Sequence, residues 1–154
     1  MPRTHFPIAV NQILLRAGKV FLLRRSLDAT FFPGMWWLPG GHHDGGETIE
    51  QATSRETFEE AGVRVDPADQ RGSCIAHTRA GLEAIHFFCV ATKFDGEPCN
   101  NEPDKAMACG WFDVNNLPSP IPLFVAQAVR DGVAQGKGIV YHPLETDPES
   151  KLYG

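Results

Sequence analysis

The sequence lacks several features that define whole classes of protein. No apolar run approaches the roughly 20 residues needed to cross a bilayer, so we expect no membrane association. Residues 1–5 lack the apolar stretch of a secretory signal peptide. The four cysteines have no Cys-x-x-Cys spacing, which argues against a zinc site. A reduced, cytoplasmic protein without structural disulfides is the expectation.

The chain also lacks the positive charge that a nucleic-acid-binding surface needs. It has 14 Lys and Arg against 19 Asp and Glu, a net charge of −5, so we expect no nucleic acid polymer as partner. Internal repeats and linker-like segments are absent from the 154 residues. That length is sufficient for one domain with its own hydrophobic core.

Three glutamates near the middle of the chain form an unusual cluster. Glu56, Glu59 and Glu60 have i, i+3, i+4 spacing, which on a helix crowds like charges at a cost of roughly 0.2–0.5 kcal/mol per pair. The cluster also falls near the expected C-terminal end of the helix, where the helix dipole disfavours anions. A bound divalent cation explains this arrangement. Carboxylate oxygens suit Mg²⁺ or Mn²⁺ better than zinc.

The rest of this helix indicates which way the cluster faces. At 3.6 residues per turn, Ile49 and Ala52 lie on the same stripe as the three glutamates, so the stripe is expected to face the protein body. Arg55 precedes Glu59 by four residues and is placed to orient it. A solvated, Glu-rich helix face is the alternative, and the helix alone does not decide between the two.

The segment before the helix favours a binding site. Residues 37–41 read Trp-Leu-Pro-Gly-Gly, and residues 44–47 read Asp-Gly-Gly-Glu. Thr48 can cap the helix, with Gln51 completing a capping box. Glycines permit close backbone approach. A strand, a glycine-rich loop, a capped helix and a carboxylate cluster, in that order, predict a cradle for a metal-bound phosphate chain.

The combined spacing resembles the Nudix box. The resemblance rests on Gly41, Glu47, Arg55-Glu56, Glu59-Glu60 and Gly62-Val63, which stand at the positions of that signature. It implies an α/β protein, a Nudix-type α/β/α sandwich with a mixed sheet, and a MutT-like pyrophosphohydrolase. Thr57 departs from the pattern, because relatives usually carry a bulky aliphatic residue there. We expect the neighbouring Phe58 to supply the missing bulk.

The resemblance also implies a metal site. Glu56, Glu59 and Glu60 would hold Mg²⁺, with Mn²⁺ as the alternative ion, and the Gly40 carbonyl would be a further ligand. No organic cofactor is expected. The ion would neutralise a diphosphate and lower the pKa of a water molecule that attacks phosphorus.

Other residues are assigned roles by the same resemblance. Glu47 and Arg55 would orient the loop and the ligand glutamates. Glu56 is a candidate general base. Glu102 is kept open as an alternative base or additional metal ligand, although residues 106–110 lack the acidic residues that relatives have there.

The sequence narrows the range of possible substrates only by elimination. Dinucleoside polyphosphate and ADP-ribose hydrolases of this family often carry a tyrosine or proline after the box, and residues 78–81 contain neither. The first hypothesis is therefore a nucleoside triphosphate pyrophosphatase acting on a small nucleoside phosphate, as a monomer or homodimer. Hydrolysis of a non-nucleotide or nucleotide-sugar pyrophosphate stays open, as does a non-catalytic Nudix-fold binding protein.

The hydrophobic pattern predicts the order of elements along the chain. We expect a domain over residues 1–138 and a loose tail over residues 139–154. Strands are expected at 5–16, 20–23, 36–38, 74–78, 84–92 and 111–114, and helices at 48–61 and 120–134.

Two pairs of neighbouring residues near the box are further candidates. Adjacent strand residues face opposite ways, so at most one of Arg24 and Arg25 is expected at the site, where it could contact phosphate. By the same alternation only one of Trp36 and Trp37 should face inward and be able to stack on a base. Phe31 and Phe32 are also candidates for stacking, whereas His77 and His86 are expected to be structural.

Overall fold

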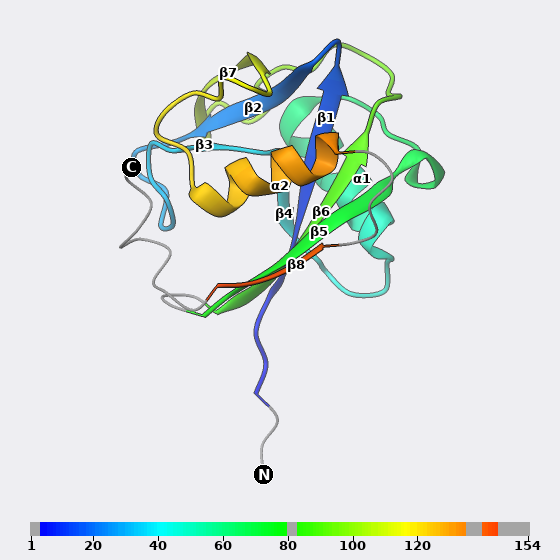
Figure 1. The fold of residues 1–154 in the computed structure, drawn as a ribbon, viewed down its shortest axis with the longest axis vertical. Coiled ribbons are helices and arrows are strands. Elements are labelled where there is room, and N and C mark those ends of the chain that lie inside the picture. The colour runs from blue at the N-terminus through cyan, green and yellow to red at the C-terminus, as the bar shows by residue number, and fades with distance from the viewer. Residues whose placement is uncertain (1–3, 80–82, 135–139, 145–154) are drawn as a thin grey trace.

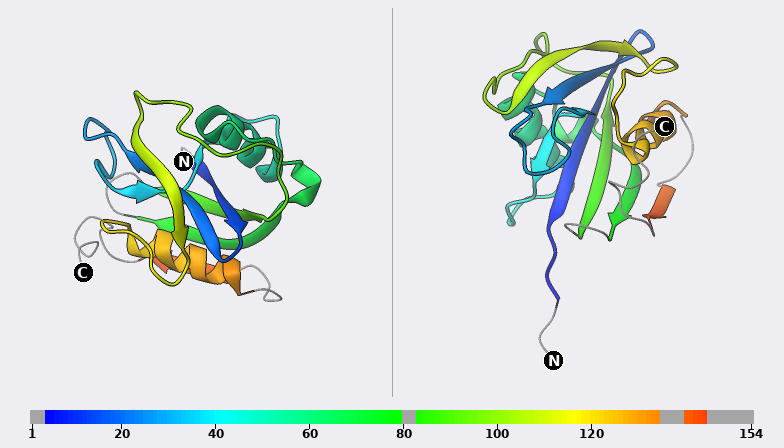
Figure 2. Two further views of the ribbon diagram at one scale, coloured as in Figure 1. Left: turned by 90° about the horizontal axis from the view of Figure 1, so that it is seen from above. Right: turned by 90° about the vertical axis from the view of Figure 1, so that its left-hand side faces the viewer.

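A mixed β-sheet lies between two helices, α1 on one face and α2 on the other (Figures 1 and 2). This computed structural model describes residues 4–79, 83–134 and 140–144. The elements are β1 (Ile8–Arg16), β2 (Lys19–Arg25), β3 (Trp36–Trp37), β4 (Gly40–His42), α1 (Ile49–Ala61), a 3₁₀ turn (Pro67–Asp69), β5 (Arg71–Thr78), β6 (Ala84–Ala91), β7 (Ala106–Asp113), α2 (Leu123–Val133) and β8 (Val140–Leu144).

Strand β1 organises the sheet. The order of strands in the sheet is β3-β2-β1-β6-β5-β8, with β4 also paired to β1 and β7 also paired to β2. β1 runs antiparallel to β2 and β4 but parallel to β6. A parallel pair needs a long crossover, and α1 lies in the chain between β1 and β6. The predicted α/β/α sandwich with a mixed sheet is confirmed.

Each face of the sheet has its own apolar core. Adjacent residues of β1 point to opposite faces: Ile13 packs with Phe124 and Val129 of α2, whereas Leu14 packs with Ala61 at the end of α1 and with Val63. Both β1 side chains are fully buried. The two cores hold the helices on opposite faces of the same strand, so β1 fixes the position of α1.

The centre of the α1–sheet interface is polar rather than apolar. Thr57, fully buried, donates a hydrogen bond to Gln12 Oε1 at 3.3 Å. The amides of Gln12 and Gln70 exchange hydrogen bonds of 3.0 and 2.6 Å. Gln70 also donates to the Ser54 hydroxyl at 3.2 Å. These four residues, Gln12, Ser54, Thr57 and Gln70, are called the amide seam below.

The expectation that Phe58 compensates for Thr57 is wrong. Phe58 is 42% exposed, with the Arg64 guanidinium 4.4 Å from its ring centre. One helical step turns it about 100° away from the sheet. The amide seam fills the space below Thr57 instead.

The region after α2 also differs from the sequence-based expectation. Val140–Leu144 is not loose but forms β8, which pairs in parallel with β5. The strand predicted at 111–114 begins earlier, at Ala106, and is not the last. Residues 139 and 145–154 of the expected tail lie outside the described residues. Within the described part of the chain, no helix is long and apolar enough to cross a membrane.

Candidate active site

The start of α1 is set by the capping box that the sequence predicts. The Thr48 hydroxyl accepts a hydrogen bond from the Gln51 amide at 3.2 Å, and the Gln51 side chain accepts one from the Thr48 N–H at 2.8 Å. The helix then runs from Ile49 to Ala61 and ends at Gly62, whose φ of 71° is readily adopted by glycine. Both ends of the predicted helix are confirmed, and they place the glutamates in its last two turns.

Two glycines bring β4 directly against these glutamates. A Cβ atom on Gly41 would lie 2.4 Å from the Glu56 carboxyl carbon, and one on Gly40 would lie 2.1 Å from the Val10 carbonyl oxygen. Gly40 therefore admits no side chain, because the contact is with the β1 backbone, whereas a side chain at position 41 would have to displace the Glu56 carboxylate. The close approach allows the Gly40 N–H to donate a hydrogen bond to Glu60 Oε2 at 3.0 Å.

Arg55 connects the carboxylates around the helix. Its guanidinium lies 2.8 Å from Glu47, 2.7 Å from Glu56 and 3.5 Å from Glu59. The hydrogen bond from Arg55 lowers the pKa of Glu47 to about 2. Arg55 also donates to the His42 carbonyl at 3.1 Å, so it ties β4 to the helix. These contacts are those expected of a residue that orients the glutamates.

Glu60 has a strongly raised pKa. Burial is the main cause that raises its pKa to about 7, and the carboxylates of Glu56 and Glu102 raise it further, while the Gly40 N–H opposes the rise. Burial also raises the pKa of Glu56, against the effect of Arg55. Perturbed acids in a cavity are typical of functional sites.

The prediction that the stripe with the three glutamates faces the protein body is correct for only part of the helix. Ala52 is fully buried, and the Glu56 side chain is only 12% exposed. Glu59, however, is 47% exposed and contacts Arg55 at the surface. The helix therefore presents Glu56 and Glu60 to the protein body and turns Glu59 toward solvent.

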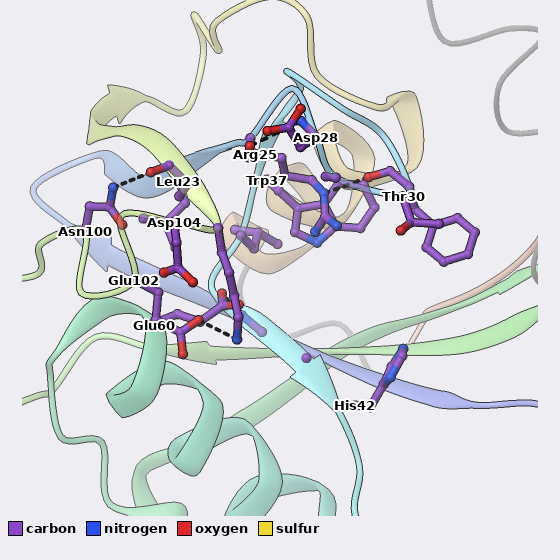
Figure 3. Close-up of a pocket in the computed structure, with 18 residues that line it drawn as sticks. Leu23, Arg25, Asp28, Thr30, Trp37, His42, Glu60, Asn100, Glu102 and Asp104 are labelled. Atoms are coloured by element: carbon purple, nitrogen blue, oxygen red, sulfur yellow. Dashed lines mark hydrogen bonds and ion pairs between the residues drawn. The ribbon is translucent and has the colours of Figure 1, made fainter.

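A cavity of about 420 Å³ extends from the end of α1 to the loop after β2 (Figure 3). Glu60, Glu102 and Gly40 line it, together with Trp37 and Phe31. Figure 3 shows Glu60 and Glu102 close together, away from Thr30 and Trp37. The cavity therefore joins carboxylates, a basic residue and aromatic rings in one space.

Only one of the two neighbouring arginines reaches this cavity, as strand alternation predicts. Arg25 lines it, with its Nε donating to the Phe31 carbonyl at 2.8 Å and its guanidinium 5.6 Å from the Trp37 ring centre. Burial lowers the pKa of this guanidinium. Arg24 instead donates to the Gly34 carbonyl at 2.9 Å.

Of the two neighbouring tryptophans, too, only one lines the cavity. Trp37 lines the cavity and donates from Nε1 to Asn11 at 3.1 Å, whereas Trp36 packs edge-on against Phe112. His77 is 2.8 Å from Glu83. His86 packs against Trp37 and Phe124, and burial lowers its pKa to about 4. Sequence reasoning missed Asp28, Asn100 and Asp104, which line the cavity from loops.

The donor set fits a hard divalent cation in its chemistry. Glu56 and Glu60 supply carboxylate oxygens, and the repulsion between Glu60, Glu56 and Glu102 is what a cation would relieve. The set is not preassembled: in the described part of the chain, no three His, Cys, Asp or Glu side chains converge as a ready-made metal group. Arg55 engages Glu56 and the Gly40 N–H engages Glu60, so those side chains would need to turn to bind an ion together.

The raised pKa of Glu60 predicts a pH-dependent stability. A carboxyl whose pKa is 4.5 unfolded and about 7 folded contributes stability fully below pH 4.5 and loses it as pH rises through 7. The Glu60→Gln variant cannot lose this contribution. In chelator, we expect the variant to exceed the wild type by roughly 2–3 kcal/mol in free energy of unfolding at pH 8, and to match it at pH 4. Urea unfolding at both pH values measures this. The same difference in free energy of unfolding between variant and wild type at pH 4 and pH 8 would contradict the prediction.

Comparison with known proteins agrees with this geometry. The family model of the NUDIX domain matches residues 5–131. The chain belongs to the Nudix family. Nudix hydrolases are pyrophosphohydrolases that act on phosphorus-containing anhydrides, and they generally use divalent metal ions.

Individual Nudix proteins show how far the similarity extends. The chain is 32% identical over 117 residues to the NAD-capped RNA hydrolase NudC of Chromobacterium violaceum, covering 74% of this chain and 41% of that protein. It is 34% identical over 110 residues to the oxidized purine nucleoside triphosphate hydrolase of Danio rerio, covering 69% and 65%. The chain thus spans less than two thirds of the length of each.

A solved Nudix structure supports the fold. The MutT Nudix hydrolase from Burkholderia pseudomallei superposes with a TM-score of 0.76 at 28% identity, covering 83% of this chain and 98% of that one. The similarity therefore extends over nearly all of that protein.

Proposed function

We propose that this Nudix protein is a Mg²⁺-dependent hydrolase of a nucleoside diphosphate linked to another group, with nucleoside triphosphates as the first candidate substrates. The cavity carries this proposal, because it joins the Glu60 carboxylate to Arg25 and Trp37. Those groups suit a cation-bound phosphate, a phosphate oxygen and a base. Several relatives are named for nucleotide substrates, including oxidized purine nucleoside triphosphate and ADP-ribose. We place the protein in the cytoplasm, as a monomer or homodimer.

Residues at the end of α1 would hold the ion. Glu56, Glu59, Glu60 and the Gly40 carbonyl are the proposed ligands. When bound, Mg²⁺ neutralises phosphate charge and activates water for attack on phosphorus. Arg55 holds Glu56 through its 2.7 Å contact and Glu47 through its 2.8 Å contact, so Arg55 and Glu47 orient the ligands.

A carboxylate must accept the proton of the attacking water. Glu56 is the first candidate, by its position in the Nudix box. Glu102 is the second, since it lines the cavity, although Lys105 lies 2.7 Å from its carboxylate.

A substrate panel with product identification tests this proposal. Nucleoside triphosphates, diphosphates, ADP-ribose, a nucleotide sugar and a non-nucleotide pyrophosphate are incubated with Mg²⁺, and the products are separated by chromatography. We expect turnover of a nucleoside triphosphate to nucleoside monophosphate and pyrophosphate. Turnover of the non-nucleotide compound alone would overturn the nucleotide assignment, and tight binding without any turnover would indicate a binding protein.

The two neighbouring arginines provide a matched pair of variants. Arg25 lines the cavity and Arg24 does not, so Arg25→Ala should raise KM roughly tenfold or more through a lost charged phosphate contact worth about 1.5–3 kcal/mol. Arg24→Ala should leave KM near the wild-type value. Steady-state kinetics of both variants measure this, and equal changes in KM would remove Arg25 from the substrate site.

A further inference from the structure

The C-terminal end of α1 has an unusual set of hydrogen-bond partners. The last carbonyls of a helix lack a partner within it, and here those of Glu59, Glu60 and Ala61 find partners elsewhere in the chain. Gly62 N–H donates to the Phe58 carbonyl at 3.0 Å. The remaining three carbonyls accept from residues 99–101, about forty positions along the chain. We name residues 99–101 the capping loop.

The capping loop donates to three successive carbonyls. Cys99 N–H donates to Ala61 at 3.0 Å and Asn101 N–H donates to Glu60 at 2.9 Å. The Asn101 side-chain amide donates to the Glu59 carbonyl at 2.9 Å. This last turn contains no basic residue, so the donors of the capping loop are placed where positive charge favours a helix end.

The capping loop is itself fixed on both sides. Before it, Asp95 exchanges backbone hydrogen bonds of 2.9 and 3.1 Å with Arg64, and Glu97 binds Arg16. From within it, the Asn100 side-chain amide donates to the Ala106 carbonyl, at the start of β7, at 2.6 Å. The helix end is therefore held against a fixed frame.

This attachment links two carboxylates of the cavity. Glu60 belongs to the helix turn that is capped, and Glu102 directly follows the capping loop. Both line the cavity, and Glu102 is among the charges that act on Glu60. Asn101 contacts the backbone of the helix rather than either carboxylate or the cavity.

We propose that Asn101 is a positioning residue, which through the Glu59 and Glu60 carbonyls sets the Glu60 carboxylate opposite Glu102 for binding the cation. The proposal rests on the metal-dependent function above. Asn101 is an exposed loop residue outside the Nudix box. The proposal gives it the role of a residue that supports a metal ligand.

The test compares Asn101→Ala with Asn116→Ala, another exposed asparagine in a turn. Mn²⁺ is titrated into metal-free protein, and free Mn²⁺ is followed by its electron paramagnetic resonance signal, without substrate. Loss of a group that supports metal ligands typically weakens affinity by about tenfold or more, and we expect that for Asn101→Ala but not for Asn116→Ala. The melting temperature of metal-free Asn101→Ala should fall by only a few degrees, since one exposed hydrogen bond is lost.

Each result has a defined meaning. Equal Mn²⁺ affinity in the two variants, or a loss in Asn101→Ala explained by general unfolding, would overturn the positioning role. A selective loss of affinity in a protein that turns over no pyrophosphate would leave the positioning role standing and overturn the proposed activity. A wild type that binds no Mn²⁺ would overturn both.

Discussion

Removal of divalent cations is expected to abolish hydrolysis, and added Mg²⁺ to restore it. The carboxylates of Glu56 and Glu102 both repel that of Glu60. Among the described residues, Arg25 and the Lys105 that pairs with Glu102 are the only arginine and lysine that line the cavity. A polyphosphate would add further negative charge. Without a cation, this site would repel its substrate as well as lack an activator for water.

The measurement is pyrophosphate release on the preferred nucleotide, in chelator and after back-titration with Mg²⁺ or Mn²⁺. We expect a loss of at least about a thousandfold, or roughly 4 kcal/mol of barrier. A circular dichroism spectrum in chelator serves as the control for folding. Full turnover without a divalent ion would contradict the metal-dependent mechanism.

Glu60→Gln is expected to lower the rate by about a thousandfold, or roughly 4 kcal/mol of barrier. The substitution keeps the shape of the side chain and removes a charge that burial disfavours, so the protein should fold at least as well as the wild type. The loss should therefore appear in kcat at saturating nucleotide and metal, not in the amount of folded enzyme.

Glu50→Gln is the matched control, because Glu50 lies in the first turn of the same helix. It should retain near-native kcat. Glu59→Gln tests the remaining glutamate of the cluster: if Glu59 is a ligand, its rate should fall like that of Glu60→Gln. A near-native rate for either variant would remove that residue from the metal site.

Local signals predicted the parts of the site that depend on nearby residues. The ends of α1 follow from Thr48, Gln51 and Gly62, which act within a few residues of the backbone they cap. Strand alternation separated Arg25 from Arg24 because it depends only on backbone geometry.

Long-range contacts determine what the sequence left unpredicted. β8 forms by pairing with β5, and Pro143 within it weakens the local strand signal. The capping loop is defined by bonds to a helix end about forty residues earlier. Glu59 was expected to face inward because the helical wheel groups it with Ala52 and Glu56, but it lies at the outer edge of that stripe, away from Thr57 and Ala61, and is 47% exposed.

The amide seam bears on how α1 could move. Apolar contacts have no preferred direction, so an apolar helix–sheet interface can shift along the helix axis with a modest loss of stability. Hydrogen bonds require defined distances and angles. Sliding α1 by one turn would separate Thr57 and Ser54 from the paired amides of Gln12 and Gln70, and would break the two hydrogen bonds between them, each worth about 0.5–1.5 kcal/mol. The seam therefore favours one position of α1 along its axis on β1. That position also fixes where the glutamates lie relative to Gly40 and Gly41.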